Sequence, residues 1–209
     1  MSRQSENPTA SEDAGRVPRP DFTPEQRKIL LQIAHDSILT SFKGSSLTDE
    51  PPRSADESAG LWMMEPRGVF CTLYLKGGLR GCVGYATAIR PLYRAVAETA
   101  RAAAFDDSRF SPVKEEEAGE LKISLSVLSP LFPIRAEEVE VGRHGLMISD
   151  GMRRGLLLPQ VPVEHGWDRK TFLQQTCRKA GLPLDAWQRF ASIDAFTAEV
   201  FGEESGVVN

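Results

Sequence analysis

Residues 69–85 read VFCTLYLKGGLRGCVGY, and this stretch decides the fold class. Two runs of strand-forming residues flank the paired glycines Gly77 and Gly78. This pattern predicts a β-hairpin, because the favoured tight turns need positive φ. With these two glycines in the turn, the register places Leu73 opposite Cys82. One face of the hairpin is then expected to carry Cys71, Leu73, Leu75, Arg80, Cys82 and Gly84.

Three helices are predicted around this hairpin. The first begins after Thr23, which forms a capping box with Gln26. Its expected apolar stripe consists of Ile29, Leu30, Ile33, Ala34 and Ile38. Residues 91–105 form an alanine-rich helix, and Asp168 caps a third helix that ends before Gly181.

Further strands follow from period-two alternation. Apolar residues alternate with polar ones over 121–128, which predicts a strand with one buried face. Asp150 and Gly151 mark a second hairpin, and residues 192–201 form the last strand. Helices and hairpins without regular βαβ alternation predict an α+β fold, with a mainly antiparallel sheet and packed helices.

The domain limits follow from composition. A chain of 209 residues with 41% hydrophobic content is long enough for one sizeable core. Residues 1–20 are too polar to bury much surface, so a disordered tail is expected there. One folded domain is expected over residues 22–201. A mobile excursion is expected at residues 43–58, and a C-terminal tail at residues 202–209.

Charge and residue usage exclude several classes of protein. A net charge of -4 without a basic block argues against a nucleic-acid partner. The absence of a long apolar run argues against a membrane, so we expect a soluble cytoplasmic protein. Three cysteines without a CxxC pair indicate reduced thiols, and three histidines show no zinc-ligand spacing. We therefore expect neither a metal nor a cofactor.

Six separated stretches resemble one family. They are LRGCVG at 79–84, AAAFDDSRF at 102–110, ISLSVLSP at 123–130, GRHGL at 142–146, GLLLPQV at 155–161 and GWDRKTFLQQTCRKAGL at 166–182. Over residues 22–201 the chain resembles the AMMECR domain family, which includes the A component of the AmmeMemoRadiSam system. The resemblance implies an α+β domain with a larger part and a smaller lobe. It also implies a radical SAM protein and a Memo-type protein as partners, and it assigns no biochemical activity.

Cys82 is the first candidate for chemistry. It lies between Gly81 and Gly84, whose missing side chains would let a ligand approach. A guanidinium at Arg80 on the same face would favour the thiolate, which is the nucleophilic form of cysteine. The alternative is a structural role, because cysteine often behaves as a small buried hydrophobe.

Three other candidates also have two interpretations each. Arg80 either binds a carboxylate or phosphate of a ligand or pairs with a nearby acid such as Asp106 or Asp107. His144 is either a general base or a group that bonds its own turn. Gln160 either contacts a polar ligand or satisfies neighbouring backbone. Asp107 is also expected to pair with Arg109 as a clasp within one loop.

Two functional hypotheses follow. In the first, the chain is an enzyme or accessory subunit with a pocket for a small polar or anionic molecule. Its candidate catalytic residues are Cys82 and His144, and its candidate substrate-binding residues are Arg80, Gly81, Gly84 and Gln160. In the second, the chain is a non-catalytic interaction module that docks through the glycine-rich hairpin. A concave pocket lined by Cys82 favours the first hypothesis, and a flat apolar patch favours the second.

Overall fold

The computed structural model describes residues 22–44 and 57–203. The expected N-terminal tail and residues 45–56 of the expected excursion lie outside this part of the chain, as do residues 204–209. The excursion ends in a 3-10 helix, Glu57–Met64. Within the described ranges, no helix has the length and apolar character needed to cross a membrane.

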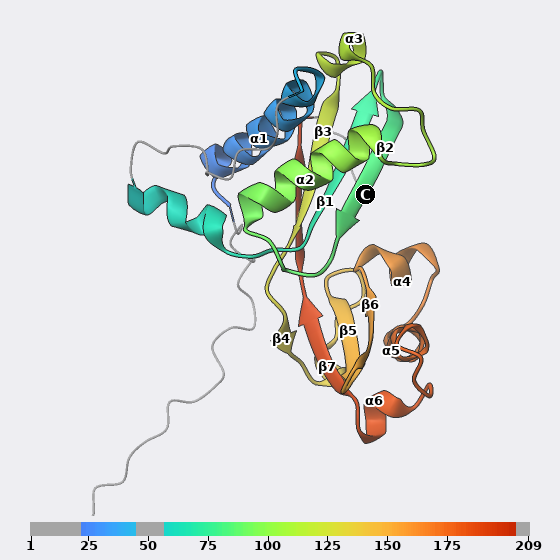
Figure 1. The fold of residues 1–209 in the computed structure, drawn as a ribbon. Helices are drawn as coiled ribbons and strands as arrows, with labels where there is room; N and C mark the ends of the chain where they lie inside the picture. The colour runs from blue at the N-terminus through green and yellow to red at the C-terminus, as the bar shows by residue number, and fades with distance from the viewer. Residues whose placement is uncertain (1–21, 45–56, 204–209) are drawn as a thin grey trace, which may run out of the picture.

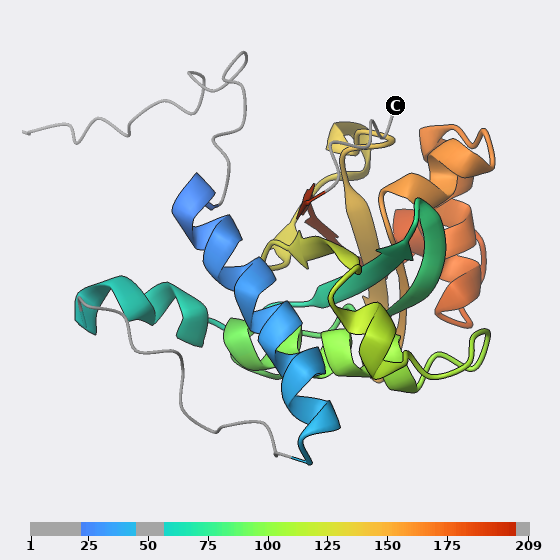
Figure 2. The same cartoon turned by 90° about the horizontal axis from the view of Figure 1, so that it is seen from above.

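The first lobe is a four-stranded antiparallel sheet covered on one face by two helices (Figures 1 and 2). Its strand order is β2-β1-β3-β8, so β2 and β8 are the edges. The strands are β1 Val69–Leu75, β2 Gly78–Tyr85, β3 Lys122–Leu128 and β8 Ala198–Gly202. The covering helices are α1 Pro24–Phe42 and α2 Leu92–Phe105, and the short α3 Glu115–Ala118 precedes β3.

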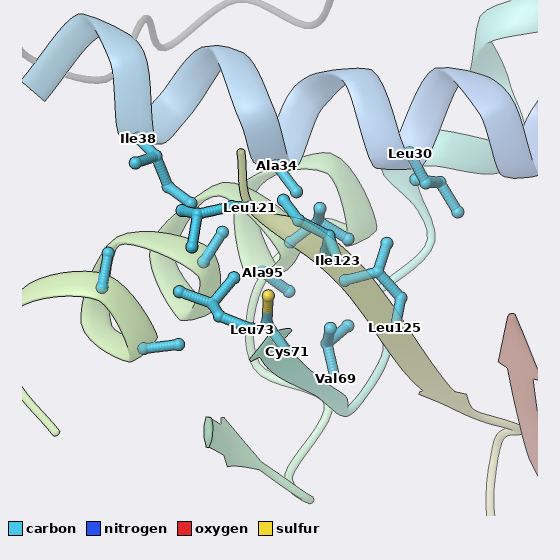
Figure 3. Packing of buried hydrophobic residues seen from close by; sticks show 14 of the residues in the cluster. Leu30, Ala34, Ile38, Val69, Cys71, Leu73, Ala95, Leu121, Ile123 and Leu125 are labelled. Atoms are coloured by element: carbon cyan, nitrogen blue, oxygen red, sulfur yellow. The ribbon is translucent and has the colours of Figure 1, made fainter. Parts of the chain in front are cut away.

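The core of this lobe lies between the helices and the sheet (Figure 3). Leu30, Ala34 and Ile38 of α1 point toward β1 and β3 and are almost fully buried. These three residues are spaced by four, so they form one row along the helix. Ile29 lies beside that row and is 38% exposed, so its expected place in the buried stripe is wrong. The predicted capping box is confirmed, because the Gln26 amide N–H donates to the Thr23 hydroxyl at 3.2 Å.

The hairpin forms, but its register differs from the predicted one. The turn residues are Lys76 and Gly77, with φ of 52° and 79°, and a β-bulge follows Leu73 in the pairing. Together these two features place Thr72, rather than Leu73, opposite Cys82. Opposite residues of an antiparallel pair share a face and neighbours along a strand do not. Cys71 therefore faces the helices, and Cys82 lies on the other face, which corrects the predicted hairpin face.

The second lobe has its own antiparallel sheet, with strand order β4-β7-β5-β6. Its strands are β4 Phe132–Pro133, β5 Gly145–Asp150, β6 Arg153–Leu157 and β7 Ser192–Phe196. Its helices are α4 Gln160–Glu164, α5 Arg169–Lys179 and α6 Ala186–Arg189, with the 3-10 helix Ala136–Glu138 before β5. Helix α5 packs on β5 and β6 and buries a separate core. Asp168 caps α5 as predicted, because the Thr171 amide donates to its carboxylate at 2.7 Å.

Two extended segments join the lobes. One follows β3 and the other runs from β7 through Thr197 into β8 (Figure 1). They are hydrogen bonded to each other, because the Ser129 amide donates to the Thr197 carbonyl and the Thr197 amide donates to the Ser129 hydroxyl, both at 2.9 Å. Every strand pair is antiparallel across the described residues, which confirms the α+β class.

Candidate functional site

Cys82 differs from the other two cysteines in its exposure. It lies on β2 at the edge of the first sheet and is partly exposed, whereas Cys71 and Cys177 are buried. Burial raises the pKa of the Cys71 thiol and of the Cys177 thiol. Those two thiols therefore remain protonated at neutral pH. Cys82 is the cysteine whose side chain solvent can reach.

The Cys82 side chain has two polar neighbours. The hydroxyl of Thr72 donates to the Cys82 sulfur at 3.3 Å. The guanidinium of Arg109 hydrogen bonds chiefly to Asp107, which raises the pKa of Arg109, and the Cys82 side chain adds a smaller contribution to the same shift. The Thr72 hydroxyl thus contacts the sulfur from β1, and the Arg109 guanidinium lies next to Cys82 in the loop after α2.

The amide and the carbonyl of Cys82 point away from the sheet and are hydrogen bonded by the loop that follows α2. Its amide donates to Asp107 Oδ2 at 2.8 Å, and its carbonyl accepts from Arg109 Nη2 at 3.2 Å. Edge strands normally leave such groups free to pair with another chain. Here an acid–arginine pair satisfies them, so this position of the edge is already occupied.

Asp107 and Arg109 form the predicted clasp. Arg109 Nε donates to Oδ1 at 2.9 Å and Nη2 donates to Oδ2 at 2.7 Å. Asp107 is 9% exposed, and the hydrogen bonds from Arg109 and from the Cys82 amide hold the pKa of its carboxyl well below its usual range. The carboxylate is therefore ionised throughout the neutral range and fixes both residues.

Arg80 makes structural contacts instead of reaching the thiol. It pairs with Glu117, with Nη2 donating to Oε2 at 2.9 Å, and Nη1 donates to the Ser111 carbonyl at 2.8 Å. Its Nη2 also donates to the Pro112 carbonyl at 3.2 Å. The pairing interpretation of Arg80 therefore describes its contacts, although the acid is Glu117 rather than Asp106 or Asp107. Arg80 ties the loop after α2 to the edge strand.

The glycines of the hexapeptide allow close packing of protein atoms. A Cβ at Gly81 would lie 2.1 Å from the carbonyl oxygen of Ala103, so α2 approaches β2 only because Gly81 has no side chain. A Cβ at Gly84 would lie 2.5 Å from the Cα and the ring of Phe70. The space beside both glycines is thus filled by α2 and by Phe70.

His144 and Gln160 lie in the second lobe. His144 is 6% exposed, its Nδ1 accepts from the Glu140 amide at 3.1 Å, and burial lowers the pKa of its imidazole. Gln160 is exposed at the start of α4. Both lie near the end of the sheet at which Leu146 pairs with Leu157, His144 directly before β5 and Gln160 shortly after β6. In the described ranges, no hydrogen bond joins either residue to β2.

Two surface hollows are lined by other segments. One, of about 630 Å³, lies between the 3-10 helix before β5, α5 and α6, and the other, of about 420 Å³, lies between α1 and β8. Cys82 lines neither of them. Among residues 22–44 and 57–203, no group of three or more metal-ligating side chains could hold a metal ion.

Sequence reasoning missed three residues of this site. Thr72 was expected on the face opposite Cys82, because the bulge after Leu73 gives no signal in the sequence. Arg109 was expected to act only within its own loop, although it also bonds the Cys82 carbonyl. Glu117 belongs to the acidic run KEEEAGE, which reads as a solvated face and gives no signal for its bond to Arg80.

Fold and site together define an α+β protein of two antiparallel sheets, with the LRGCVG hexapeptide on an edge strand. The AMMECR1 family model matches residues 31–201, and the chain belongs to this family. It is 41% identical over 195 residues to Protein MK0488 of Methanopyrus kandleri, covering 88% of this chain and 91% of the relative. It is 46% identical over 193 residues to Protein PH0010 of Pyrococcus horikoshii, covering 86% and 91%.

A solved structure shares the fold. The crystal structure of the uncharacterized protein PH0010 from Pyrococcus horikoshii matches with a TM-score of 0.63 and 42% sequence identity. The match covers 84% of this chain and 90% of that chain. The family resemblance predicted from the six sequence stretches is therefore confirmed.

Proposed function

We propose that the chain is an enzyme or accessory subunit whose reactive group is the Cys82 thiol. The observation that carries this proposal is the exposure of Cys82 next to a hydroxyl donor, Thr72, and a guanidinium, Arg109. A hydrogen-bond donor and a positive charge both stabilise a thiolate relative to the neutral thiol. The thiolate is the form that attacks an electrophile.

The surrounding residues have holding roles in this proposal. Arg80 and Gly81 fix the loop after α2 and helix α2 itself against the edge strand. Gly84 accommodates Phe70 on the face that carries Cys82. In this proposal Cys82 contacts the small polar or anionic substrate, and His144 and Gln160 do not.

The proposed partners are a radical SAM protein and a Memo-type protein. This part of the proposal is supported by the resemblance of the six sequence stretches to the A component of the AmmeMemoRadiSam system. In such a complex, the thiol gives its proton to solvent and the sulfur displaces a leaving group from the electrophilic carbon of a molecule that a partner supplies. The thioether or thioester formed in this way holds that molecule. The face opposite α1 and α2 is the surface at which the transfer takes place.

The test is covalent capture from a metabolite extract. The purified protein is incubated with the extract, and the peptide containing residue 82 is analysed by mass spectrometry. We expect an added mass on wild-type Cys82 and none on the peptide from Cys82→Ser. Cys71→Ala, which removes a buried thiol from the opposite face, is the matched control and is expected to retain capture. An unmodified Cys82 in extracts of several growth conditions would contradict the proposal.

Two observations favour the second candidate, a docking module. Cys82 lines neither described hollow, and Leu79 next to the hairpin turn is 46% exposed. A module that docks through the hairpin would bind its partner equally well as wild type and as Cys82→Ser. Loss of binding in Leu79→Lys with no effect of Cys82→Ser would support this candidate over the first.

A further inference from the structure

The guanidinium of Arg109 is held in place although its side chain is 57% exposed. Nε and Nη2 donate to the two carboxylate oxygens of Asp107, and Nη2 also donates to the Cys82 carbonyl. Nη1 has no acceptor among the described residues, so its two N–H groups are free for a ligand. A side chain that is already oriented loses less conformational freedom when it binds an anion.

In the clasp, the carboxylate of Asp107 is buried and the guanidinium of Arg109 is exposed. The Asp107 side chain is 6% exposed, and its oxygens accept from the Cys82 amide and from Arg109. Asp106 precedes it in the same loop and is exposed, and Glu117 of α3 is paired with Arg80. Within the clasp, a ligand therefore meets the guanidinium of Arg109 before the carboxylate of Asp107.

We propose that the Cys82 site takes a small electrophile that carries a carboxylate, with the carboxylate bound by Nη1 of Arg109. The inference rests on the proposed function, since it needs a reactive thiol. Arg109 Nη2 donates to the Cys82 carbonyl at 3.2 Å, so only a short ligand spans the distance from the guanidinium to the thiol of the same residue. The thiol proton passes to solvent, the sulfur forms a bond to the electrophilic carbon, and the leaving group departs with the electron pair of the broken bond.

Two alkylating agents of the same size test this specificity. Iodoacetate and iodoacetamide share the same leaving group and differ in having a carboxylate or a neutral amide. We expect the ratio of their rates at Cys82 to exceed the ratio for glutathione by about two- to fivefold, which is the range of an exposed ion pair. Arg109→Gln is expected to lower the ratio to that of glutathione. Arg153→Gln, which removes another exposed arginine paired with an acid, is the matched control and should leave it unchanged.

Ionic strength gives a second measurement that does not depend on the folding of a variant. Added salt screens an exposed charge, so the ratio at wild-type Cys82 should fall toward the glutathione value as salt rises. A wild-type ratio equal to that of glutathione at low salt overturns the carboxylate specificity. Slow alkylation of wild-type Cys82 by iodoacetamide is a separate result, because it overturns the reactive thiol itself.

Discussion

Leu125→Ala is expected to lower the free energy of unfolding by about 2–5 kcal/mol, because the residue is fully buried. Leu125 lies on β3, between β1 and β8, and belongs to the core under α1 and α2 (Figure 3). Removal of the side chain leaves a cavity. Because β3 is paired with a strand on each side, the surrounding structure can fill this cavity only in part. Urea unfolding followed by circular dichroism measures the change.

Val200→Ala is the control for Leu125→Ala. Val200 lies on the neighbouring strand β8, pairs with Ser126 on the other face of the sheet and is 59% exposed. Its truncation is expected to change the free energy of unfolding by about 0.5 kcal/mol or less. Equal effects of the two substitutions would mean that the first lobe does not bury its core on the face of Leu125.

Gly81→Ala is expected to destabilise the protein by about 1–3 kcal/mol or more, because the added methyl group overpacks a backbone contact. The new Cβ would lie 2.1 Å from the Ala103 carbonyl oxygen, and a backbone atom of a helix does not rotate away as a side chain does. Helix α2 has to move off the edge strand to accommodate it. The free energy of unfolding from urea titration again gives the size of the effect.

Gly78→Ala separates this clash from the general effect of replacing a glycine. Gly78 begins the same strand, has no positive φ, and a Cβ there would meet only the Leu75 carbonyl at an ordinary 3.6 Å. Its substitution is expected to be close to neutral. If Gly81→Ala proved as mild as Gly78→Ala, the close approach of α2 to Gly81 would be contradicted.

Local patterns predicted most of the elements, although the single strand expected over residues 192–201 is divided into β7 and β8 of different sheets. The capping box of Thr23, the cap at Asp168 and the alternation around Leu125 each depend on a few neighbouring residues, and all three are confirmed. The clasp of Asp107 with Arg109 also lies within three residues of sequence. Interactions of this range can be read from the chain because no distant segment is needed to form them.

Long-range pairings could not be predicted in the same way. The register of the hairpin depends on a one-residue difference in the turn and on a bulge after Leu73, and the bulge moves the side chains of one strand to the other face. The bond from Arg80 to Glu117 joins residues 37 apart. His144 belongs to the second lobe, which folds around a separate core of its own. No spacing in the sequence indicates whether such residues meet.

The rate at which iodoacetamide alkylates each cysteine of the native protein tests the central claim most directly. Peptide mass analysis over a time course at neutral pH resolves Cys71, Cys82 and Cys177 in one experiment. We expect Cys82 to react well ahead of the other two, because they are buried and their thiols remain protonated. If Cys82 reacted no faster than Cys177, its thiol would be a packed structural group, and the claim of a reactive site on this face would be wrong.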